Sequence, residues 1–147
     1  MKEAKLTKEF LDLFIKNLRF EDKQELNELY KDNSFEEFYE ICLNEEFQTY
    51  FLTTNDDKPL ALGGAFRIDE KSARIWLLVT NEFKNNKISL FKYVKNKINF
   101  FKNEYEILYN YIFESNFDSL VWLKSLGFKV LDLKIPNYKM FYYKKGV

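Results

Sequence analysis

Hydrophobic residues recur every three or four positions through the first part of the chain, which is the spacing of helices with one buried face. The first stripe follows Thr7, a residue type that caps helix N-termini, and consists of Phe10, Leu11, Phe14, Ile15 and Leu18. A second stripe consists of Leu26, Leu29 and Tyr30. A third follows the capping-box pair Ser34 and Glu37 and consists of Phe35, Phe38, Tyr39 and Cys42. The pattern predicts three helices, with Cys42 as a small core residue.

After Phe47, short apolar runs bounded by turn residues replace the helical spacing. The turn sequence NDDKP separates the first two of three such runs, which cover 48–54, 60–68 and 73–80. They predict three strands in a meander. Glycine weakens a strand, so Gly63 and Gly64 inside the second run indicate a bulge or a close approach of two backbones.

In the second half of the chain, segments with the three- or four-residue spacing of helices alternate with short apolar runs typical of strands. Its longest predicted helix carries a stripe of Ile88, Phe91, Val94, Ile98 and Phe101. A strand over 106–113 and a helix closed by Gly127 follow, and a hairpin of 128–135 and 138–145 ends the pattern. The predicted order is helices, three strands, helix, strand, helix and two strands.

The composition excludes several kinds of functional site and of protein. The chain has 147 residues, 46% of them hydrophobic, which predicts one packed globular core. It has no histidine and one cysteine, which excludes an internal disulfide, Ser-His catalysis and a Cys-His zinc site, so no metal is expected. The apolar runs are far shorter than the ~18 residues of a membrane span, and the amino end lacks a signal-like segment. We therefore expect a cytoplasmic protein without membrane contact.

Charge is unevenly distributed although the net charge is zero. Residues 1–50 contain 13 acidic and 7 basic residues, whereas residues 84–147 contain 5 acidic and 12 basic residues. Segment 84–102 has no acid and six lysines: Lys84, Lys87, Lys92, Lys95, Lys97 and Lys102. This segment is either a solvated helix face or a surface for a phosphate-rich ligand or nucleic acid.

Two stretches resemble the GNAT superfamily of N-acetyltransferases. Segment 116–128 is similar to a family pattern of Asn, a small residue three positions later, an aromatic or aliphatic pair, Lys, and Gly-Phe; here these are Asn116, Ser119, Trp122, Leu123, Lys124, Gly127 and Phe128. The stretch LALGGAF resembles the family's glycine-containing third strand. With the order of elements, the resemblance covers about residues 47–144.

The resemblance implies an α+β (α/β) fold of three layers, in which helices flank a central mixed, mostly antiparallel β-sheet. It also implies a single domain over residues 1–147. Within it, 1–46 would form the N-terminal helices, 47–112 the strands and the coenzyme-loop helix, and 113–147 the closing helix and terminal hairpin.

The same resemblance places a coenzyme loop at residues 79–89. The family commonly shows Val-x-Pro-Glu-Tyr-Arg-Gly-x-Gly-x-Gly there, and its backbone N–H groups hold the pyrophosphate of acetyl-CoA. Here Lys87 and Ser89 occupy two of the glycine positions. Either lysine charge, the serine hydroxyl and turn-forming asparagines replace the glycines, or these side chains fill the groove.

The cofactor implied by the resemblance is acetyl-CoA. The residues that the alignment assigns to it are Leu78, Val79, Thr80, Lys84, Asn85, Asn86, Lys87, Ile88, Ser89, Asn116, Ser119 and Trp122.

Candidate catalytic residues are few. The family often uses a tyrosine on the last helix as general acid, and the matching residue is Leu123. Tyr109 and Tyr111 share one face of their strand, where one of them, preferably Tyr111, is a replacement acid or both are core aromatics. For the base, Glu114 is preferred over Glu82, the alternative being a solvated carboxylate near a helix N-terminus.

Three functions remain open. The first is an acyl-CoA-dependent N-acyltransferase that moves acetyl directly from acetyl-CoA to an unidentified amine of a small molecule or protein. The second is a catalytically inactive GNAT-fold binding or structural protein, because the family's tyrosine and loop glycines are absent. The short chain, Trp-Leu-Lys in the last helix and the divergent coenzyme loop also resemble small GNAT-like proteins of tailed phages and prophages, including relatives of an internal virion protein, which would act in a host cytoplasm or virion. Nucleic-acid binding ranks last, because the aromatics of 88–101 fall on the buried stripe. A homodimer is compatible with all three.

Overall fold

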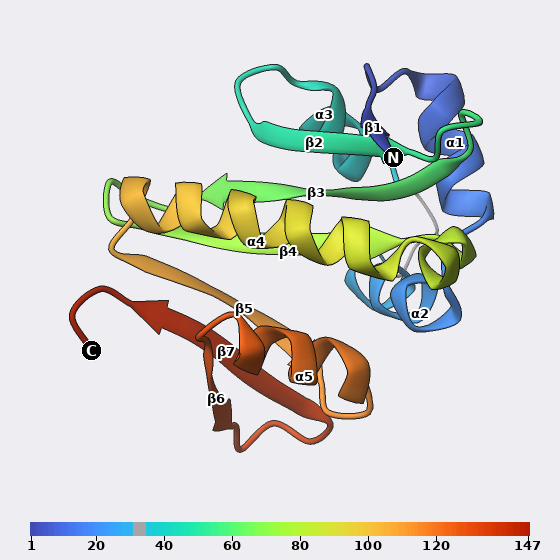
Figure 1. The fold of residues 1–147 in the computed structure, drawn as a ribbon. Helices are drawn as coiled ribbons and strands as arrows, with labels where there is room; N and C mark the ends of the chain where they lie inside the picture. Colours follow the sequence, from blue (N-terminus) through green and yellow to red (C-terminus); the bar gives the residue numbers. More distant parts are fainter. Residues whose placement is uncertain (31–34) are drawn as a thin grey trace. The chain divides into compact units, whose positions relative to one another are not determined.

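The computed structural model describes residues 1–30 and 35–147, which form two compact units (Figure 1). Unit 1 consists of Met1–Gly64 and Trp76–Phe91. Unit 2 consists of Ala65–Ile75 and Lys92–Val147.

The helices lie where the hydrophobic pattern predicts them, but Leu29 of the second predicted stripe is 73% exposed, at the last residue of its helix. They are α1 (Lys8–Lys16), α2 (Phe20–Leu29), α3 (Glu36–Leu43), the short 3-10 helix η1 (Asn81–Asn85), α4 (Lys87–Glu104) and α5 (Phe117–Ser125). Thr7 caps α1, as predicted, since its side chain accepts the Phe10 N–H at 3.2 Å. The predicted cap at Ser34 lies outside the described residues. None of the described helices is long and apolar enough to cross a membrane.

Seven strands form one sheet. They are β1 (Lys2–Glu3), β2 (Gln48–Thr53), β3 (Pro59–Arg67), β4 (Ser72–Val79), β5 (Ile107–Phe113), β6 (Lys129–Asp132) and β7 (Tyr138–Lys144). Their hydrogen-bonding order is β1-β2-β3-β4-β5-β7-β6, with β4 and β5 parallel. The predicted α+β class with a mixed, mostly antiparallel sheet is thus confirmed.

Two strand predictions differ from the structure, since one strand was missed and another was predicted too long. The hydrophobic pattern missed β1, because its two exposed residues carry no apolar signal and pair with Leu52 and Thr53 far along the chain. It also extended the first strand of the terminal hairpin to residue 135, whereas β6 ends at Asp132. The intervening turn includes Asn137 with φ 72°, a left-handed conformation that asparagine tolerates.

In the core of unit 1, the buried faces of α1, α2 and α3 pack against β2, β3 and β4. Its buried members are Leu11, Phe14, Leu18, Leu26, Phe38, Cys42, Phe51, Leu62 and Leu78. Cys42 is a core residue, as predicted, and burial raises its pKa to about 12, so it stays a neutral thiol. This cluster holds α1, α2 and α3 on β2, β3 and β4.

In unit 2, β7 pairs with the whole of β5 and with β6. Phe128 and Phe141 meet edge to face at 5.5 Å. The Lys102 ammonium group donates to the Leu126 carbonyl at 2.9 Å and lies 4.7 Å from the ring centre of Tyr143. A cation at this place satisfies the C-terminal end of α5, beside Gly127 with φ 92°.

The predicted apolar stripe of α4 was wrong at its first position. Ile88 is 75% exposed, whereas Leu90, Ile98 and Phe101 are buried. The helix begins at Lys87, so Ile88 lies in the first turn, and the buried face runs through Leu90.

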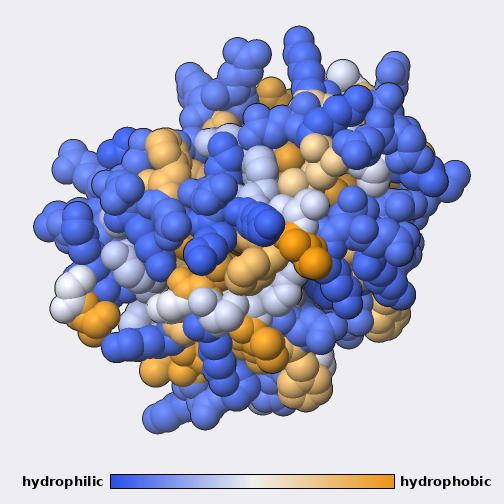
Figure 2. All heavy atoms as spheres, viewed as in Figure 1, coloured by the Kyte–Doolittle hydropathy of each residue, from blue (hydrophilic) through white to orange (hydrophobic). Residues whose placement is uncertain are grey.

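In the view of Figure 2, most surface atoms belong to hydrophilic residues, with hydrophobic groups scattered among them.

Gly63 and Gly64 lie where neighbouring backbones approach closely, as predicted. A Cβ on Gly63 would lie 2.5 Å from the Trp76 carbonyl oxygen, and one on Gly64 would lie 1.9 Å from that of Gln48. Because both obstacles are backbone atoms, no rotamer change relieves the clash.

We expect Gly64→Ala to lower the free energy of unfolding by about 3 kcal/mol or more, because the strand must shift away from β2. Urea unfolding measures it. Gly146→Ala is the control, since nothing lies within 4 Å of its added Cβ and it should cost at most about 1 kcal/mol. Equal midpoints for the two variants would contradict the close-approach argument.

Candidate functional site

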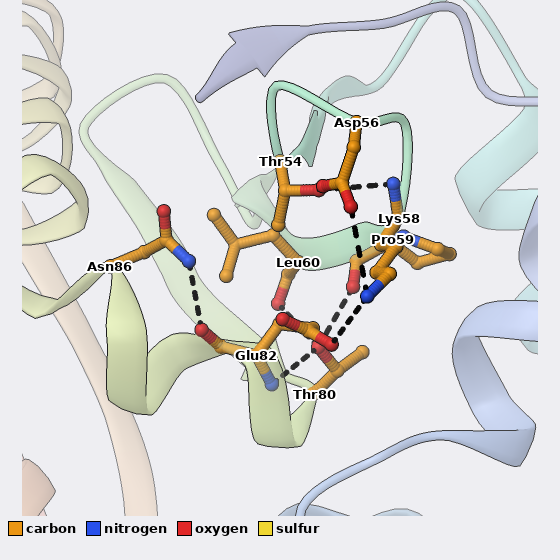
Figure 3. Close-up of polar contacts among 8 residues, drawn as sticks. All are labelled: Thr54, Asp56, Lys58, Pro59, Leu60, Thr80, Glu82 and Asn86. Atoms are coloured by element: carbon orange, nitrogen blue, oxygen red, sulfur yellow. Dashed lines mark hydrogen bonds and ion pairs between the residues drawn. The ribbon is translucent and has the colours of Figure 1, made fainter.

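Thr80 organises the point where β4 passes into η1. Its side chain is almost fully buried and donates a hydrogen bond to the Pro59 carbonyl at 2.8 Å. The same oxygen accepts the Glu82 N–H at 3.3 Å, so Thr80 caps η1 (Figure 3). The Thr80 N–H also donates to the Leu60 carbonyl. Thr80 therefore anchors the candidate coenzyme loop to β3.

The turn between β2 and β3 contacts the same loop. The Lys58 ammonium group lies 3.9 Å from a Glu82 carboxylate oxygen and 3.6 Å from Asp56 (Figure 3). Thr54 closes the turn by donating to Asp56 and accepting the Lys58 N–H. Glu82 is thus held by an ion pair and by its place in η1.

The N-terminus of α4 presents backbone donors to solvent. The Leu90 N–H makes the first helical bond, to the Asn86 carbonyl at 2.9 Å. Among residues 1–30 and 35–147, no acceptor is recorded for the N–H groups of Lys87, Ile88 and Ser89, and all three residues are exposed. These are the unpaired first-turn donors that bind anions at helix N-termini.

Two lysines and two asparagines surround these donors. Lys84 and Asn85 are exposed on η1, and the Asn86 side chain donates to the Glu82 carbonyl at 2.9 Å. The Lys87 ammonium group lies 5.5 Å from the ring centre of Phe83, so its side chain covers η1. Asn85, Lys87 and Ser89, which occupy the three glycine positions of the family pattern, are therefore all outside the protein core.

A buried ion pair between Arg19 and Asp22 holds the end of β4 to the start of α2. The Arg19 guanidinium contacts both carboxylate oxygens of Asp22, at 3.2 and 3.1 Å. One of these oxygens also accepts the Val79 N–H at 2.9 Å, and the Arg19 N–H donates to the Val79 carbonyl at 2.9 Å. The guanidinium carbon lies 5.3 Å from the ring centre of Phe83. Val79 thus has both backbone groups occupied, and Leu78 beside it is a core residue.

In unit 2, Asn110 interrupts the ladder between β4 and β5. The last paired residues are Arg74 and Tyr109, and the next backbone bond would join the Tyr111 N–H to the Ile75 carbonyl. Instead, the Asn110 amide donates to Ile75 at 2.9 Å, and its oxygen accepts the Tyr111 N–H at 2.8 Å. The side chain of Asn110 therefore ends the direct backbone pairing.

Tyr109 and Tyr111 share one face of β5, as predicted, but neither is fully buried. The Arg74 guanidinium lies 5.6 Å from both ring centres, and the rings meet edge to face at 6.3 Å. Tyr111 is 39% exposed. It is therefore not the core aromatic of the alternative interpretation, and its role as an acid stays a prediction.

The other candidates of unit 2 surround the start of α5. Glu114 is exposed, and its charge acts on Lys139. Asn116 is buried and caps α5 by accepting the Ser119 N–H at 3.4 Å. Ser119 and Trp122 are half-buried, as is Leu123 at the family's tyrosine position.

The structure thus brings the loop candidates together in unit 1, from Leu78 to Ser89, and the remaining candidates in unit 2. Sequence reasoning missed Asp22 and Asn110. Asp22 lies one turn before Leu26, on the buried face of the second predicted helix. Acidic residues are rarely buried without a partner, and this was the only sign in the sequence that Asp22 makes a structural contact. Nothing in the sequence around Asn110 indicates its contacts.

Acetyl-CoA would need donors for its diphosphate. Three backbone N–H groups, Lys84 and Lys87 at one helix end fit such an anion. Because Val79 offers no unoccupied backbone group, the fit rests on η1 and the first turn of α4.

We expect Asp22→Asn to destabilise the protein by about 3 to 5 kcal/mol, because it leaves the Arg19 charge buried without its partner. Urea unfolding of Asp22→Asn beside Asp118→Asn, an exposed aspartate on α5, measures the difference. A cost below about 1 kcal/mol would show that the ion pair does not hold β4.

We expect Asn110→Ala to cost about 1 to 3 kcal/mol, because the Ile75 carbonyl and the Tyr111 N–H both lose their partner. Asn103→Ala on the exposed side of α4 is the control and should change little. Faster amide exchange of Tyr111 in Asn110→Ala, measured by NMR, would identify the lost contact; unchanged exchange would contradict it.

No protein-family model and no curated protein matches the sequence. Solved structures do match. The GNAT-family acetyltransferase of Staphylococcus aureus Mu50 has a TM-score of 0.69 at 14% identity, over 97% of this chain and 98% of that one. The GNAT domain of S. lividans PAT has a TM-score of 0.68 at 11% identity, over 97% and 88%.

A third similar structure is a mutant of the spermidine N-acetyltransferase SpeG of Vibrio cholerae, with a TM-score of 0.61 at 13% identity, over 98% of this chain and 95% of that one. At such identities the likeness concerns the fold. The structure of this chain is therefore that of the GNAT acetyltransferases, which the order of elements and segment 116–128 had indicated.

Proposed function

We propose that this protein is an N-acetyltransferase that binds acetyl-CoA at η1 and the start of α4 and transfers the acetyl group directly to an amine. The observation that carries the proposal is the set of N–H groups at Lys87, Ile88 and Ser89, which have no recorded acceptor in the described part of the chain and are flanked by two lysines, in the loop that the resemblance assigns to the coenzyme. The similar structures named above are acetyltransferases, which supports the same chemistry.

The N–H groups and the ammonium groups of Lys84 and Lys87 would hold the diphosphate. Here lysine charge replaces the close backbone approach that glycine permits, because charge-assisted hydrogen bonds are stronger than neutral ones and the long lysine side chain carries the charge to the phosphate. Asn116, Ser119 and Trp122 are proposed to contact the coenzyme from α5, on the basis of the resemblance of segment 116–128.

Acetyl-CoA would supply an activated acyl group as a thioester. The protein must then bind an amine, remove one of its protons and exclude water from the acyl group. Tyr111 and Glu114 are the sequence-based candidates for proton transfer, and both are exposed.

The alternative is a GNAT-fold protein without catalysis, including a role in phage assembly or host takeover. Leu123 in place of the family's tyrosine favours it, because leucine has no proton to donate to a leaving thiolate. So does Val79, whose backbone groups are occupied by Arg19 and Asp22.

Isothermal calorimetry with acetyl-CoA tests the site. We expect micromolar binding, weakened about three- to tenfold by Lys84→Ala and by Lys87→Ala, because each removes an ammonium contact to phosphate at an exposed position. Lys92→Ala and Lys95→Ala, exposed on the same helix beyond its first turn, should bind like the wild type.

Acetyl transfer is measured separately by release of free thiol, with spermidine and a lysine-containing peptide as acceptors. Binding without turnover of either amine would support the inactive alternative. Absence of binding at millimolar acetyl-CoA would refute both the site and the enzyme.

A further inference from the structure

Glu25 on α2 carries a half-buried carboxyl group. In the described parts of the chain it makes no recorded hydrogen bond or ion pair. Burial raises its pKa to about 7, the Asp22 charge adds to the rise, and the Arg19 charge opposes it. A carboxyl group of this kind takes up and releases a proton near neutral pH, as a general base must.

The fold places Glu25 beside the end of β4. Asp22, one helical turn earlier, is bonded to the Val79 N–H at 2.9 Å. Leu26, the next residue, packs in the core cluster that contains Leu78. Since residues one turn apart lie on the same face of a helix, Glu25 is near the point where β4 passes into the candidate coenzyme loop.

Few charged groups act on this position. Asp22 and Arg19 neutralise each other in their ion pair, and Glu21 lies 3.5 Å from Arg19. The end of β4 contributes no ionisable side chain from Trp76 to Thr80, and η1 approaches Arg19 through the ring of Phe83. Glu25 is therefore the one carboxyl group described at this end of β4 that no ion pair engages.

We propose that Glu25 is the general base that removes a proton from the acceptor amine. The inference rests on the proposed function. The ammonium form of the amine gives one proton to the Glu25 carboxylate, and its nitrogen forms the new C–N bond as the C–S bond breaks. The second nitrogen proton goes to the leaving thiolate, and Glu25 releases its proton to solvent.

The other carboxylates are less suited to this step. Asp22 is engaged by Arg19 and the Val79 N–H, and Glu82 is ion-paired with Lys58. Glu114, the base candidate from the sequence, is exposed, and its charge acts on Lys139.

The test compares Glu25→Gln with Glu28→Gln, an exposed acid one turn further along α2. With spermidine as acceptor, Glu25→Gln should lower kcat about 100-fold or more and keep the wild-type Kd for acetyl-CoA. In the wild type, kcat should rise with pH through an apparent pKa near 7, and this dependence should be lost in Glu25→Gln. Glu28→Gln should behave like the wild type.

A second readout needs no turnover. The side-chain carboxyl of Glu25, followed by carbon-13 NMR in the coenzyme-free protein, should titrate near pH 7. Because its pKa is higher in the folded than in the unfolded chain, the wild type should lose stability relative to Glu25→Gln as pH rises from about 4.5 to about 7.

The outcomes are separable. Wild-type kcat and pH dependence in Glu25→Gln, or titration of Glu25 near 4.5, overturn this inference and leave the proposed function intact. Binding of acetyl-CoA without transfer to spermidine or a lysine-containing peptide overturns it in favour of the inactive alternative. Loss of both binding and transfer in the wild type overturns the proposed function as well.

Discussion

The buried pair of Arg19 and Asp22 is the contact on which the candidate site depends. Asp22 is 2% exposed, and its carboxylate is satisfied by the guanidinium and by the Val79 N–H together. Burial raises the pKa of Asp22, while Arg19 and the Val79 N–H lower it. Since a buried charge is costly without partners, the start of α2 and the end of β4 are held together.

That contact extends to η1 and the start of α4, where the anion site is proposed. Arg19 lies over one side chain of η1, Phe83, and Lys87 of α4 lies near the same ring. Thr80 anchors η1 to β3 by its buried hydroxyl group. The loop is therefore held by polar contacts to the strands and by cation–ring contacts, and its first-turn N–H groups remain exposed to solvent. A glycine-free loop can keep these donors, because their direction is set by the helix and not by the side chains.

Much of the fold could be predicted from local patterns. Thr7 as a cap, Gly127 as a helix end and the alternation in β5 are properties of neighbouring residues, and each was confirmed. The close approach at Gly63 and Gly64 was also predictable, since glycine inside a strand needs a structural reason. The exposure of Ile88 was not, because the burial of a first helical turn depends on where the helix begins.

The sequence by itself determined the order of the helices and of the strands after β1 and indicated the GNAT-like fold, because periodicity and short motifs are local. Only the tertiary structure decided which polar groups are engaged. Asp22 meets Val79, and Asn110 replaces a backbone bond between Ile75 and Tyr111, across separations of up to 57 residues. Such pairings satisfy buried polar groups, and their partners are chosen by packing in space, which no local pattern encodes.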